Sequence, residues 1–415
     1  MQRNRRTGVR VSYLIFFFVL IVFFQNVYSA EEKIDPVRWK KALAIHQKAI
    51  VIDTHSDTPM AIFEEGRDLG KRSDKGEVDF VRMKEGGLGA MFFAVFVSNN
   101  RDDKHSAKDA LEGIDEIYRQ VQKNPSLTAL AYSPADILSL HAQGKRAILI
   151  GIENGGPLEG SLRILRDYYR LGARYITLTH NKNNDICDSA TADKPQWNGL
   201  SPFGKDVVKE MNRLGMLIDI SHVSDKTFYD VIRESQAPVF ASHSCARTVC
   251  SAPRNMTDDM LRALAKKGGV IQVNFFSAFV DQDFKNKSDA FEKDREPELK
   301  KLAETYKGNP KAHWEEYGKL FKKYGPSDPP LESLIKQIDY IVKLVGVDYV
   351  GLGSDFDGAG SFPVGLQDVT GYPKITYELL KRGYKEEDIK KILGGNFLRV
   401  FNAVIKTAEK IKAGK

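Results

Sequence analysis

Residues Ala147-Ile148-Leu149-Ile150-Gly151-Ile152-Glu153 form an apolar run that ends on a carboxylate. A short run of this kind is typical of a parallel strand buried on both faces, and it predicts a strand over Ala147–Ile152. Seven similar runs occur past residue 40: Ala49–Asp53, Met91–Val97, Tyr175–Thr179, Met216–Ile220, Val239–Ser242, Val270–Phe275 and Tyr349–Gly353. Amphipathic stretches separate the runs, so the sequence predicts repeated βα units.

Eight strands with intervening helices predict an α/β protein with a (β/α)8 TIM-like barrel, and a doubly wound open sheet is the alternative. Two of the intervening helices have N-terminal signals: Ser224 begins a predicted helix over Ser224–Glu234, and Thr257 begins one over Thr257–Lys267. We expect residues 30–415 to form one barrel domain, because this length lies within the range of barrels with insertions.

A charged stretch interrupts the alternation before the last strand. Residues 276–330 are rich in Lys, Glu and Asp, and Pro329 and Pro330 precede a helix that we predict over Leu331–Val345. We expect a helical insertion here. It either reaches over the mouth of the barrel or is a solvent-exposed segment without a role.

The first 29 residues differ from the rest of the chain. Four Arg precede an apolar run of 11 residues, Leu14–Phe24. In Val27-Tyr28-Ser29, an aliphatic and a small residue then stand at positions −3 and −1 of a cut before Ala30. This order is typical of a secretory signal peptide, and the run is shorter than the ~20 residues of a spanning helix. We therefore expect cleavage of residues 1–29 and an exported, periplasmic or extracellular protein without a stable membrane span. A retained signal anchor is the alternative.

Charge and cysteine content exclude some functional classes. The formal net charge is +7, and it falls to +3 once the four Arg of the first 29 residues are removed. This modest charge, without a basic stripe, argues against nucleic-acid binding. The three cysteines, Cys187, Cys245 and Cys250, form no CxxC motif, and their odd number leaves at least one unpaired without revealing which.

Side chains that bind metals follow several of the predicted strands. Those at a strand end, or within two residues of one, are His55, Glu153, His180, His222, His243 and Asp355. In a barrel such positions meet at the C-terminal rim, where barrel enzymes carry their active sites. The remaining histidines lie in helical or loop stretches, and we interpret them as surface or packing residues: His46, His105, His141 and His313.

The types of these residues indicate a metal site. His55 and Asp57 are two residues apart in an extended segment, so they point in the same direction. Glu153 is desolvated among apolar residues and needs a partner, which is either a cation or an Arg or backbone amides. With His222 and His243 the set suits zinc, or manganese or cobalt as substitutes. Two such ions activate a bridging water for hydrolysis. Singly, each histidine is more often a packed residue than a ligand.

The order of the motifs resembles that of the membrane (renal) dipeptidase family of zinc metallopeptidases. The motifs are Ile52-Asp53-Thr54-His55-Ser56-Asp57, Gly151-Ile152-Glu153, Leu178-Thr179-His180, Ile220-Ser221-His222-Val223-Ser224, Ser242-His243-Ser244, Arg254-Asn255 and Gly353-Ser354-Asp355-Phe356-Asp357-Gly358. Together they are specific and span residues 40–405. Two segments depart from the pattern of some relatives: Asn154-Gly155-Gly156 lacks a His, and Asn274-Phe275-Phe276 lacks a Tyr. These departures leave the shape of the substrate pocket open.

The resemblance implies an exported, bacterial-type enzyme that cleaves free dipeptides with a hydroxide bridging two zinc ions per chain. It implies that His55 and Asp57 hold one ion and that His222 and His243 hold the other. Glu153 would bridge the two ions. Members of this family are often dimers, and a homodimer is an open alternative here.

The resemblance also implies residues that contact the dipeptide. His180 would lie near the scissile carbonyl, Arg254 on the substrate carboxylate, and Asp355 near the substrate amine or the leaving nitrogen. Glu153, His180 and Asp355 are then the expected catalytic residues.

Two other functions compete with this one. The first is a binuclear amidohydrolase for cyclic amides or lactones. Such barrels usually open with HxH and carry a bridging Lys, whereas this chain has an HxD motif and Glu153. The second is a non-catalytic exported metal-binding barrel. We expect such a barrel to have lost some of its metal ligands, whereas the set of candidate ligands is complete in this chain.

Overall fold

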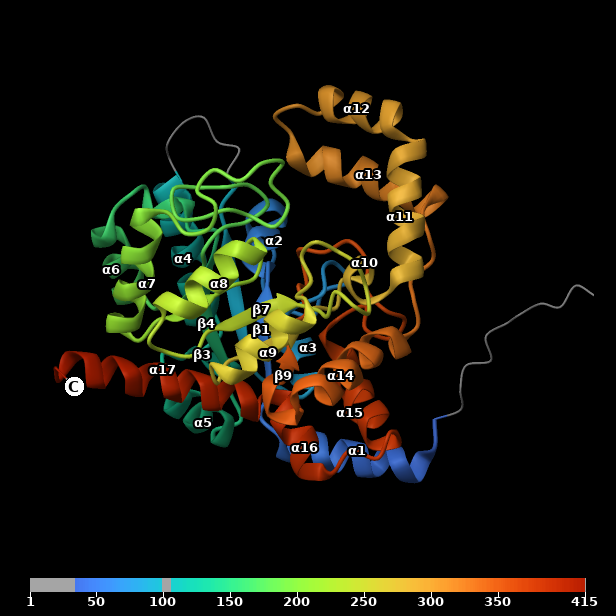
Figure 1. The fold of residues 1–415 in the computed structure, drawn as a ribbon. Coiled ribbons are helices and arrows are strands. Elements are labelled where there is room, and N and C mark those ends of the chain that lie inside the picture. Colours follow the sequence, from blue (N-terminus) through green and yellow to red (C-terminus); the bar gives the residue numbers. More distant parts are fainter. Residues whose placement is uncertain (1–33, 99–105, 415) are drawn as a thin grey trace, which may run out of the picture. The chain divides into compact units, whose positions relative to one another are not determined.

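Eight parallel strands form the central sheet (Figure 1). The computed structural model describes residues 34–98 and 106–414. The strands follow one another around the sheet as β1 (Val51–Ser56), β2 (Leu88–Phe96), β4 (Arg146–Glu153), β5 (Ala173–Thr177), β6 (Leu217–Asp219), β7 (Phe240–Ser244), β8 (Val270–Val273) and β9 (Val350–Leu352). Each overlaps one of the eight predicted runs. The sequence analysis missed β3 (Thr128–Leu130), a strand of three residues that pairs with the first half of β4 off this path.

The sheet is nearly closed between its last strand and its first. Ser56 and Phe356 form a parallel bridge just beyond β9, and the Asp355 N–H donates to the His55 carbonyl over 3.0 Å. The order of the eight strands never reverses, as it would in a doubly wound sheet. The protein therefore has the predicted (β/α)8 barrel, and the open-sheet alternative is wrong.

Helices cover the outside of the barrel. They are α1 (Pro36–Lys48), α2 (Thr58–Glu65), α3 (Phe80–Glu85), α4 (Ser106–Lys123), α5 (Pro134–Ala142), α6 (Leu162–Arg170), α7 (Pro202–Leu214), α8 (Asp225–Glu234), α9 (Asp258–Lys266), α14 (Leu331–Val345), α15 (Tyr372–Lys381), α16 (Glu386–Lys390) and α17 (Asn396–Lys412). The two predicted N-caps are confirmed, because the side chain of Ser224 accepts from the Thr227 N–H and that of Thr257 from the Met260 N–H. The predicted bounds of α14 are also confirmed.

Aromatic rings fill the barrel below its C-terminal rim. The ring of Tyr175 on β5 lies 5.0 Å from Phe92 on β2 and 5.6 Å from Phe240 on β7. Phe397, near the start of α17, lies 5.5 Å from Phe92 and closes the opposite end, where Figure 1 shows α17. Because rings from strands on different sides meet here, the interior is a packed core, and the site must lie at the rim.

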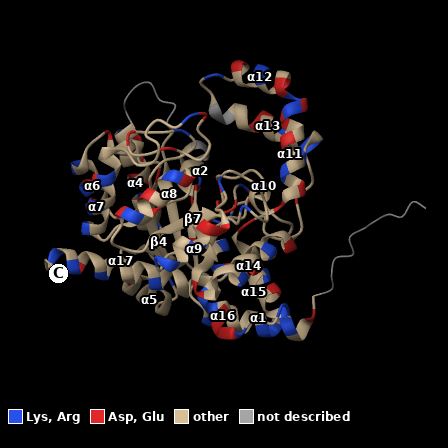
Figure 2. Ribbon diagram, viewed as in Figure 1, with Lys and Arg blue, Asp and Glu red and all other residues tan. Residues whose placement is uncertain are grey.

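The predicted insertion is helical. It consists of α10 (Ser277–Val280), α11 (Gln282–Asp294), α12 (Glu296–Thr305) and α13 (Pro310–Tyr324), and the last three project from the barrel in Figure 1. Phe291 and Phe321 pack 5.1 Å apart between α11 and α13, whereas α12 has no buried side chain. Lys and Arg alternate with Asp and Glu along these helices (Figure 2). Trp314 on α13 is 62% exposed, so the insertion is solvated over much of its surface.

Two of the predictions lie outside the described residues. They are the signal peptide over residues 1–29 and the interpretation of His105. In the part of the chain that the structure describes, no helix is both long and apolar enough to cross a membrane. Cys187, Cys245 and Cys250 are buried free thiols.

Candidate metal centre

All of the site residues predicted from the sequence meet at the C-terminal rim. His55, Glu153 and His243 lie within β1, β4 and β7, near the carboxyl ends of these strands. Asp57, His180, His222, Arg254 and Asp355 stand in the loops that follow β1, β5, β6, β7 and β9. Parallel strands direct their carboxyl ends to one edge, so residues up to 300 positions apart in the sequence come together here.

Glu153 occupies the centre of the cluster. Its Oε2 lies 3.5 Å from His55 Nε2, while its Oε1 lies 3.0 Å from His222 Nε2 and 3.5 Å from His243 Nε2. The two oxygens of one carboxylate therefore face different histidines. This is the geometry that a ligand shared between two cations requires.

Further donors surround this centre. His55 Nε2 lies 3.6 Å from Asp57 Oδ2 and 3.9 Å from Asp355 Oδ1, and His180 Nε2 lies 3.8 Å from Glu153 Oε1. Three overlapping groups have ligand atoms within 4.8 Å of one another: His55, Glu153 and His243; Glu153, His180 and His222; and His55, Asp57 and Asp355. Asp355 and His180, which the sequence predicts as catalytic and substrate-contacting residues and not as ligands, therefore also lie within reach of a cation.

The electrostatics of the cluster fit divalent cations. Burial holds the pKa of His222 and of His243 well below the usual value, and the neutral imidazole is the form that binds metal. Burial and the neighbouring Glu153 raise the pKa of Asp57 to about 6. Burial also lowers the pKa of His55, but Glu153 and Asp57 outweigh it and raise that pKa. His55 Nε2 is buried without a hydrogen-bond partner among the described residues. Cations between these carboxylates and nitrogens would satisfy all of these groups.

His55, His222 and His243, whose Nε2 atoms face the cluster, each have a contact at Nδ1. His55 Nδ1 lies 2.9 Å from the Tyr175 hydroxyl, His222 Nδ1 lies 3.1 Å from Asn181 Oδ1, and His243 Nδ1 lies 2.7 Å from Ser242 Oγ. Such partners orient a ligand histidine and leave Nε2 for the metal. The sequence analysis missed all three partners. Only Ser242, adjacent to His243, carries a signal that sequence reasoning could have used.

Two residues of the cluster have left-handed backbone conformations. The φ angle is 69° at His222 and 67° at Asp355, which is uncommon for residues other than glycine. His222 follows β6 and Asp355 follows β9, and both side chains belong to the candidate cation groups. Such local strain persists where the surrounding structure fixes it, and it concentrates at functional sites.

Three groups next to the proposed ligands suit a small zwitterion: the guanidinium of Arg254, the imidazole of His180 and the carboxyl of Asp355. Arg254 is buried, its Nη2 donates to the His243 carbonyl over 3.2 Å, and its Nε has no hydrogen-bond partner in the described chain. Burial, together with the positive charge of Arg254, lowers the pKa of His180 to about 3, so this imidazole is neutral. Asn274 Nδ2 donates to Asp355 Oδ2 over 2.8 Å. The sequence analysis noted Asn274 only as part of a variable segment.

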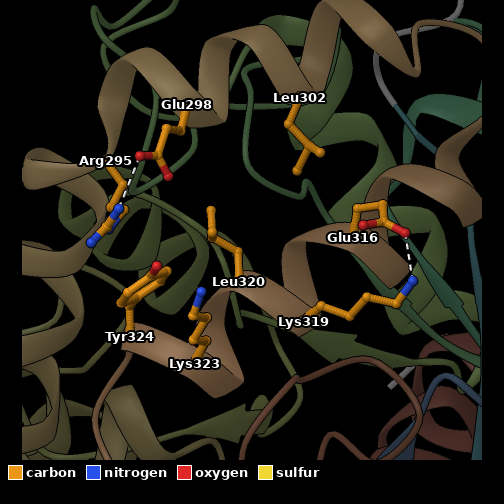
Figure 3. A pocket seen from close by; sticks show the side chains of 8 residues that line it. All are labelled: Arg295, Glu298, Leu302, Glu316, Lys319, Leu320, Lys323 and Tyr324. Carbon is orange, nitrogen blue, oxygen red and sulfur yellow. Dashed lines mark hydrogen bonds and ion pairs between the residues drawn. The ribbon is translucent and has the colours of Figure 1, made fainter.

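A cavity of about 350 Å³ in the insertion is separate from this cluster (Figure 3). It is lined by Arg295, Glu298, Leu302, Glu316, Lys319, Leu320, Lys323 and Tyr324. Figure 3 shows two of its ion pairs, Arg295 with Glu298 and Lys319 with Glu316. Its lining includes none of the residues of the rim cluster.

Comparison with known proteins agrees with this site. The model of the membrane dipeptidase family (peptidase family M19) matches residues 39–415. Dipeptidase 3 of Mus musculus is 33% identical over 385 residues, which cover 91% of this chain and 69% of that protein.

Solved structures show the same relationship. The probable dipeptidase PvdM of Pseudomonas aeruginosa has a TM-score of 0.77 at 29% identity, covering 89% of this chain and 99% of that one. An amidohydrolase from the same organism has a TM-score of 0.68 at 25% identity, covering 88% and 98%. The resemblance inferred from the motifs is confirmed: the chain belongs to the membrane dipeptidase family and is a peptide-bond hydrolase.

Proposed function

We propose that the chain is a zinc-dependent dipeptidase that hydrolyses the peptide bond of free dipeptides. The observation that carries the proposal is the position of Glu153, whose two oxygens face separate histidines beside a buried Arg254. Peptide-bond hydrolysis follows from the family. The identity of the metal, the number of ions and the role of each residue are the proposed part.

The proposed ligands divide into two sets that share Glu153. His55 and Asp57 hold one ion, and His222 and His243, whose Nε2 atoms lie 2.9 Å apart, hold the other. Imidazole nitrogens with carboxylate oxygens favour zinc, with manganese or cobalt as substitutes. When bound, two such ions would activate a water molecule as the nucleophile and polarise the scissile carbonyl.

The protein's own groups bind the dipeptide and move its protons. Arg254 offers a planar fork to the substrate carboxylate. Neutral His180 donates a hydrogen bond to the carbonyl oxygen as negative charge develops there. Burial raises the pKa of Asp355, which prepares this carboxyl to take up a proton and pass it to the leaving nitrogen.

This arrangement selects substrates by length. The free amine and carboxylate of an extended dipeptide are at most ~7 Å apart. Asp355 and Arg254 can hold these two charges on either side of the cluster. A third residue would bury an unpaired charge or collide with the rim, so we expect dipeptides to be preferred over tripeptides and N-acetylated dipeptides.

A substrate panel with and without a chelator tests the proposal. We expect cleavage of free dipeptides and loss of activity with chelator that zinc restores, and the panel includes dipeptides with a D-residue in second place to find the stereochemical preference. Elemental analysis should find two ions per active chain. Because one structural relative is described as an amidohydrolase, the panel includes cyclic amides and lactones. Cleavage of these without cleavage of dipeptides, or activity that resists chelation, overturns the proposal.

An exported location belongs to the same proposal. It rests on the order of basic, apolar and small residues before Ala30. Sequencing the N-terminus of the native protein should find a start near Ala30. A start that retains Leu14–Phe24 contradicts export with cleavage and favours a signal anchor.

A further inference from the structure

Two fully buried carboxylates, Asp53 on β1 and Asp219 on β6, lie below the metal cluster. Neither belongs to the groups of described residues whose ligand atoms could hold a cation. Each precedes a proposed ligand histidine in its own segment, His55 in one case and His222 in the other. A buried carboxylate is costly unless it is fully hydrogen-bonded, so its partners indicate what it does.

The four donors to Asp53 come mainly from the neighbouring end of the barrel. Its Oδ1 accepts from the His55 N–H over 3.1 Å and from the Ser354 N–H over 2.9 Å. Its Oδ2 accepts from the Ser354 hydroxyl over 2.5 Å and from the Tyr372 hydroxyl over 2.6 Å. Asp53 thus ties β1 to the residues that come after β9.

Asp219 has the same four kinds of donor. Its Oδ1 accepts from the Ser221 N–H over 3.0 Å and from the Ser242 N–H over 2.8 Å. Its Oδ2 accepts from the Ser242 hydroxyl over 2.6 Å and from the Thr177 hydroxyl over 2.5 Å. Asp219 thus ties β6 to β7. Both carboxylates lie at junctions where backbone pairing is sparse. Among the described residues, β6 and β7 share one registered pair, and the segment after β9 meets β1 through one bridge, Ser56 with Phe356.

The two junctions differ in the residue next to the serine. Ser242 donates its only proton to Asp219, so its oxygen must accept from His243 Nδ1, 2.7 Å away. That hydrogen bond places the proton of the imidazole on Nδ1 and the lone pair on Nε2, which faces Glu153. Ser354 precedes Asp355 rather than a histidine, and His55 Nδ1 contacts Tyr175 instead. The side-chain hydrogen bonds from Asp53 therefore do not reach a ring nitrogen of a proposed ligand histidine.

We propose that Asp219 is a positioning residue of the metal centre. Through Ser242 it holds His243 in the tautomer whose Nε2 can bind a cation, whereas Asp53 closes the barrel and sets no tautomer. This inference rests on the proposed assignment of His243 as a metal ligand.

Asp219→Asn is the decisive variant. The amide keeps the shape and one acceptor oxygen, but its NH2 group now donates to the Ser242 oxygen. Ser242 then turns its own proton toward His243 Nδ1, which moves the imidazole proton to Nε2 and removes a ligand. We expect the affinity for zinc, measured by chelator competition, to fall roughly 10- to 100-fold, as loss of an outer partner of a ligand histidine does.

Asp53→Asn is the matched control. Asp53 has the same burial and the same donors, so we expect both variants to lose thermal stability. The zinc affinity of Asp53→Asn should change by less than about threefold, whereas that of Asp219→Asn should fall by the larger factor expected for the loss of an outer partner of a ligand. Equal zinc affinities in the two variants overturn the proposal.

A second readout is independent of metal and of turnover. In 15N-histidine spectra of the metal-free protein, the wild type and Asp53→Asn should show His243 protonated at Nδ1, and Asp219→Asn should show it protonated at Nε2. An unchanged tautomer overturns the proposal. Should Asp219→Asn fail to fold, Ser242→Ala with Ser354→Ala as its control carries the same comparison. A wild type that cleaves no dipeptide would refute the proposed function and leave these tautomer and affinity comparisons intact.

Discussion

The rim of the barrel and the helical insertion use acidic and basic side chains in opposite ways. At the rim, Glu153 and Arg254 are buried; Glu153 on β4 contacts His55 on β1 and His243 on β7, and Arg254 donates to the His243 carbonyl. In the insertion, Lys285 pairs with Asp289 and Lys287 with Asp283, each within one turn of the same helix. A buried charge depends on partners that the whole fold must place, whereas an exposed pair within a helix contributes little. Consequences of substitution should therefore decrease from the rim to the insertion.

Glu153→Gln is expected to have the largest effect. A neutral amide offers one oxygen, so it cannot bridge two cations as the carboxylate does. We expect kcat/KM to fall by more than the ~100-fold that loss of an outer partner costs, with loss of at least one tightly bound ion. Steady-state kinetics and elemental analysis of the purified variant check this. Active wild-type enzyme with at most one tightly bound ion would contradict the two-ion assignment.

Asp355→Asn tests proton transfer at the rim. Asn274 would still contact the substituted side chain, so the geometry should persist while the titratable group is lost. If Asp355 passes a proton to the leaving nitrogen, kcat should fall about 100-fold. Asn274→Ala is the informative control, because it leaves the carboxyl in place and removes its orienting partner. A fall in kcat/KM that lies entirely in KM would reassign Asp355 to amine binding alone.

Arg254→Ala is expected to act on binding. The guanidinium contacts the dipeptide carboxylate in both the ground and the transition state, so KM should rise with little change in kcat. Loss of charge-assisted hydrogen bonds corresponds to about a 10- to 100-fold rise. Dipeptide amides, which lack the carboxylate, should show a smaller difference between the wild type and the variant. An equal loss for acids and amides would show that Arg254 supports the site rather than the substrate.

That His55, Glu153, His222 and His243 meet at one rim could be predicted, because the pattern combines strand periodicity with residue type. Each of these four side chains stands where an apolar run ends, and a barrel brings all such ends to one rim. The side chains that contact the Nδ1 atoms of these histidines could not be found in this way. Tyr175 lies in the middle of β5, where its sequence context predicts a core aromatic, and its contact with His55 depends on which ring fits across the barrel.

Two features of the fold escaped prediction for different reasons. The three residues of β3 are too few for a periodic signal, and their pairing with β4 depends on tertiary contacts. The left-handed turns at His222 and Asp355 require φ values that their residue types do not signal, because no glycine stands there. Both residues are held by backbone hydrogen bonds to distant segments: the Asp355 N–H donates to the His55 carbonyl, and the His222 carbonyl accepts from the Ala190 N–H.

Burial also has consequences away from the rim, at His46 on α1. Its ring lies 2.7 Å from the Thr376 hydroxyl and 2.8 Å from the Gly86 carbonyl, and burial lowers its pKa below 6.5. The unfolded chain therefore takes up a proton more readily than the folded chain. The contribution of His46 to stability is complete at a pH above the pKa that it has in the unfolded chain. This contribution is lost as the pH falls toward the lower pKa that it has in the folded chain.

His46→Gln isolates this contribution. We expect the variant to be less stable than the wild type at pH 8 and to lose less further stability as the pH falls below 6.5. Urea unfolding across this range, at fixed metal loading, measures the difference between the two proteins. Parallel curves would show that the neutral form of His46 is not required by the fold.

The smallest effect on catalysis is expected from Phe291→Ala in the insertion. Phe291 is buried against Phe321 and Tyr317, and none of these three rings belongs to the described core of the barrel. Loss of the ring should loosen α11–α13 locally, so hydrogen exchange should rise over residues 282–324 while kcat/KM changes less than about twofold. Phe92→Ala is the matched control, because this ring packs against Tyr175 below His55. It should cost about 3–5 kcal/mol of stability and disturb the site. A loss of activity in Phe291→Ala as large as that in Phe92→Ala would place the insertion in the catalytic unit and remove the distinction between the two regions.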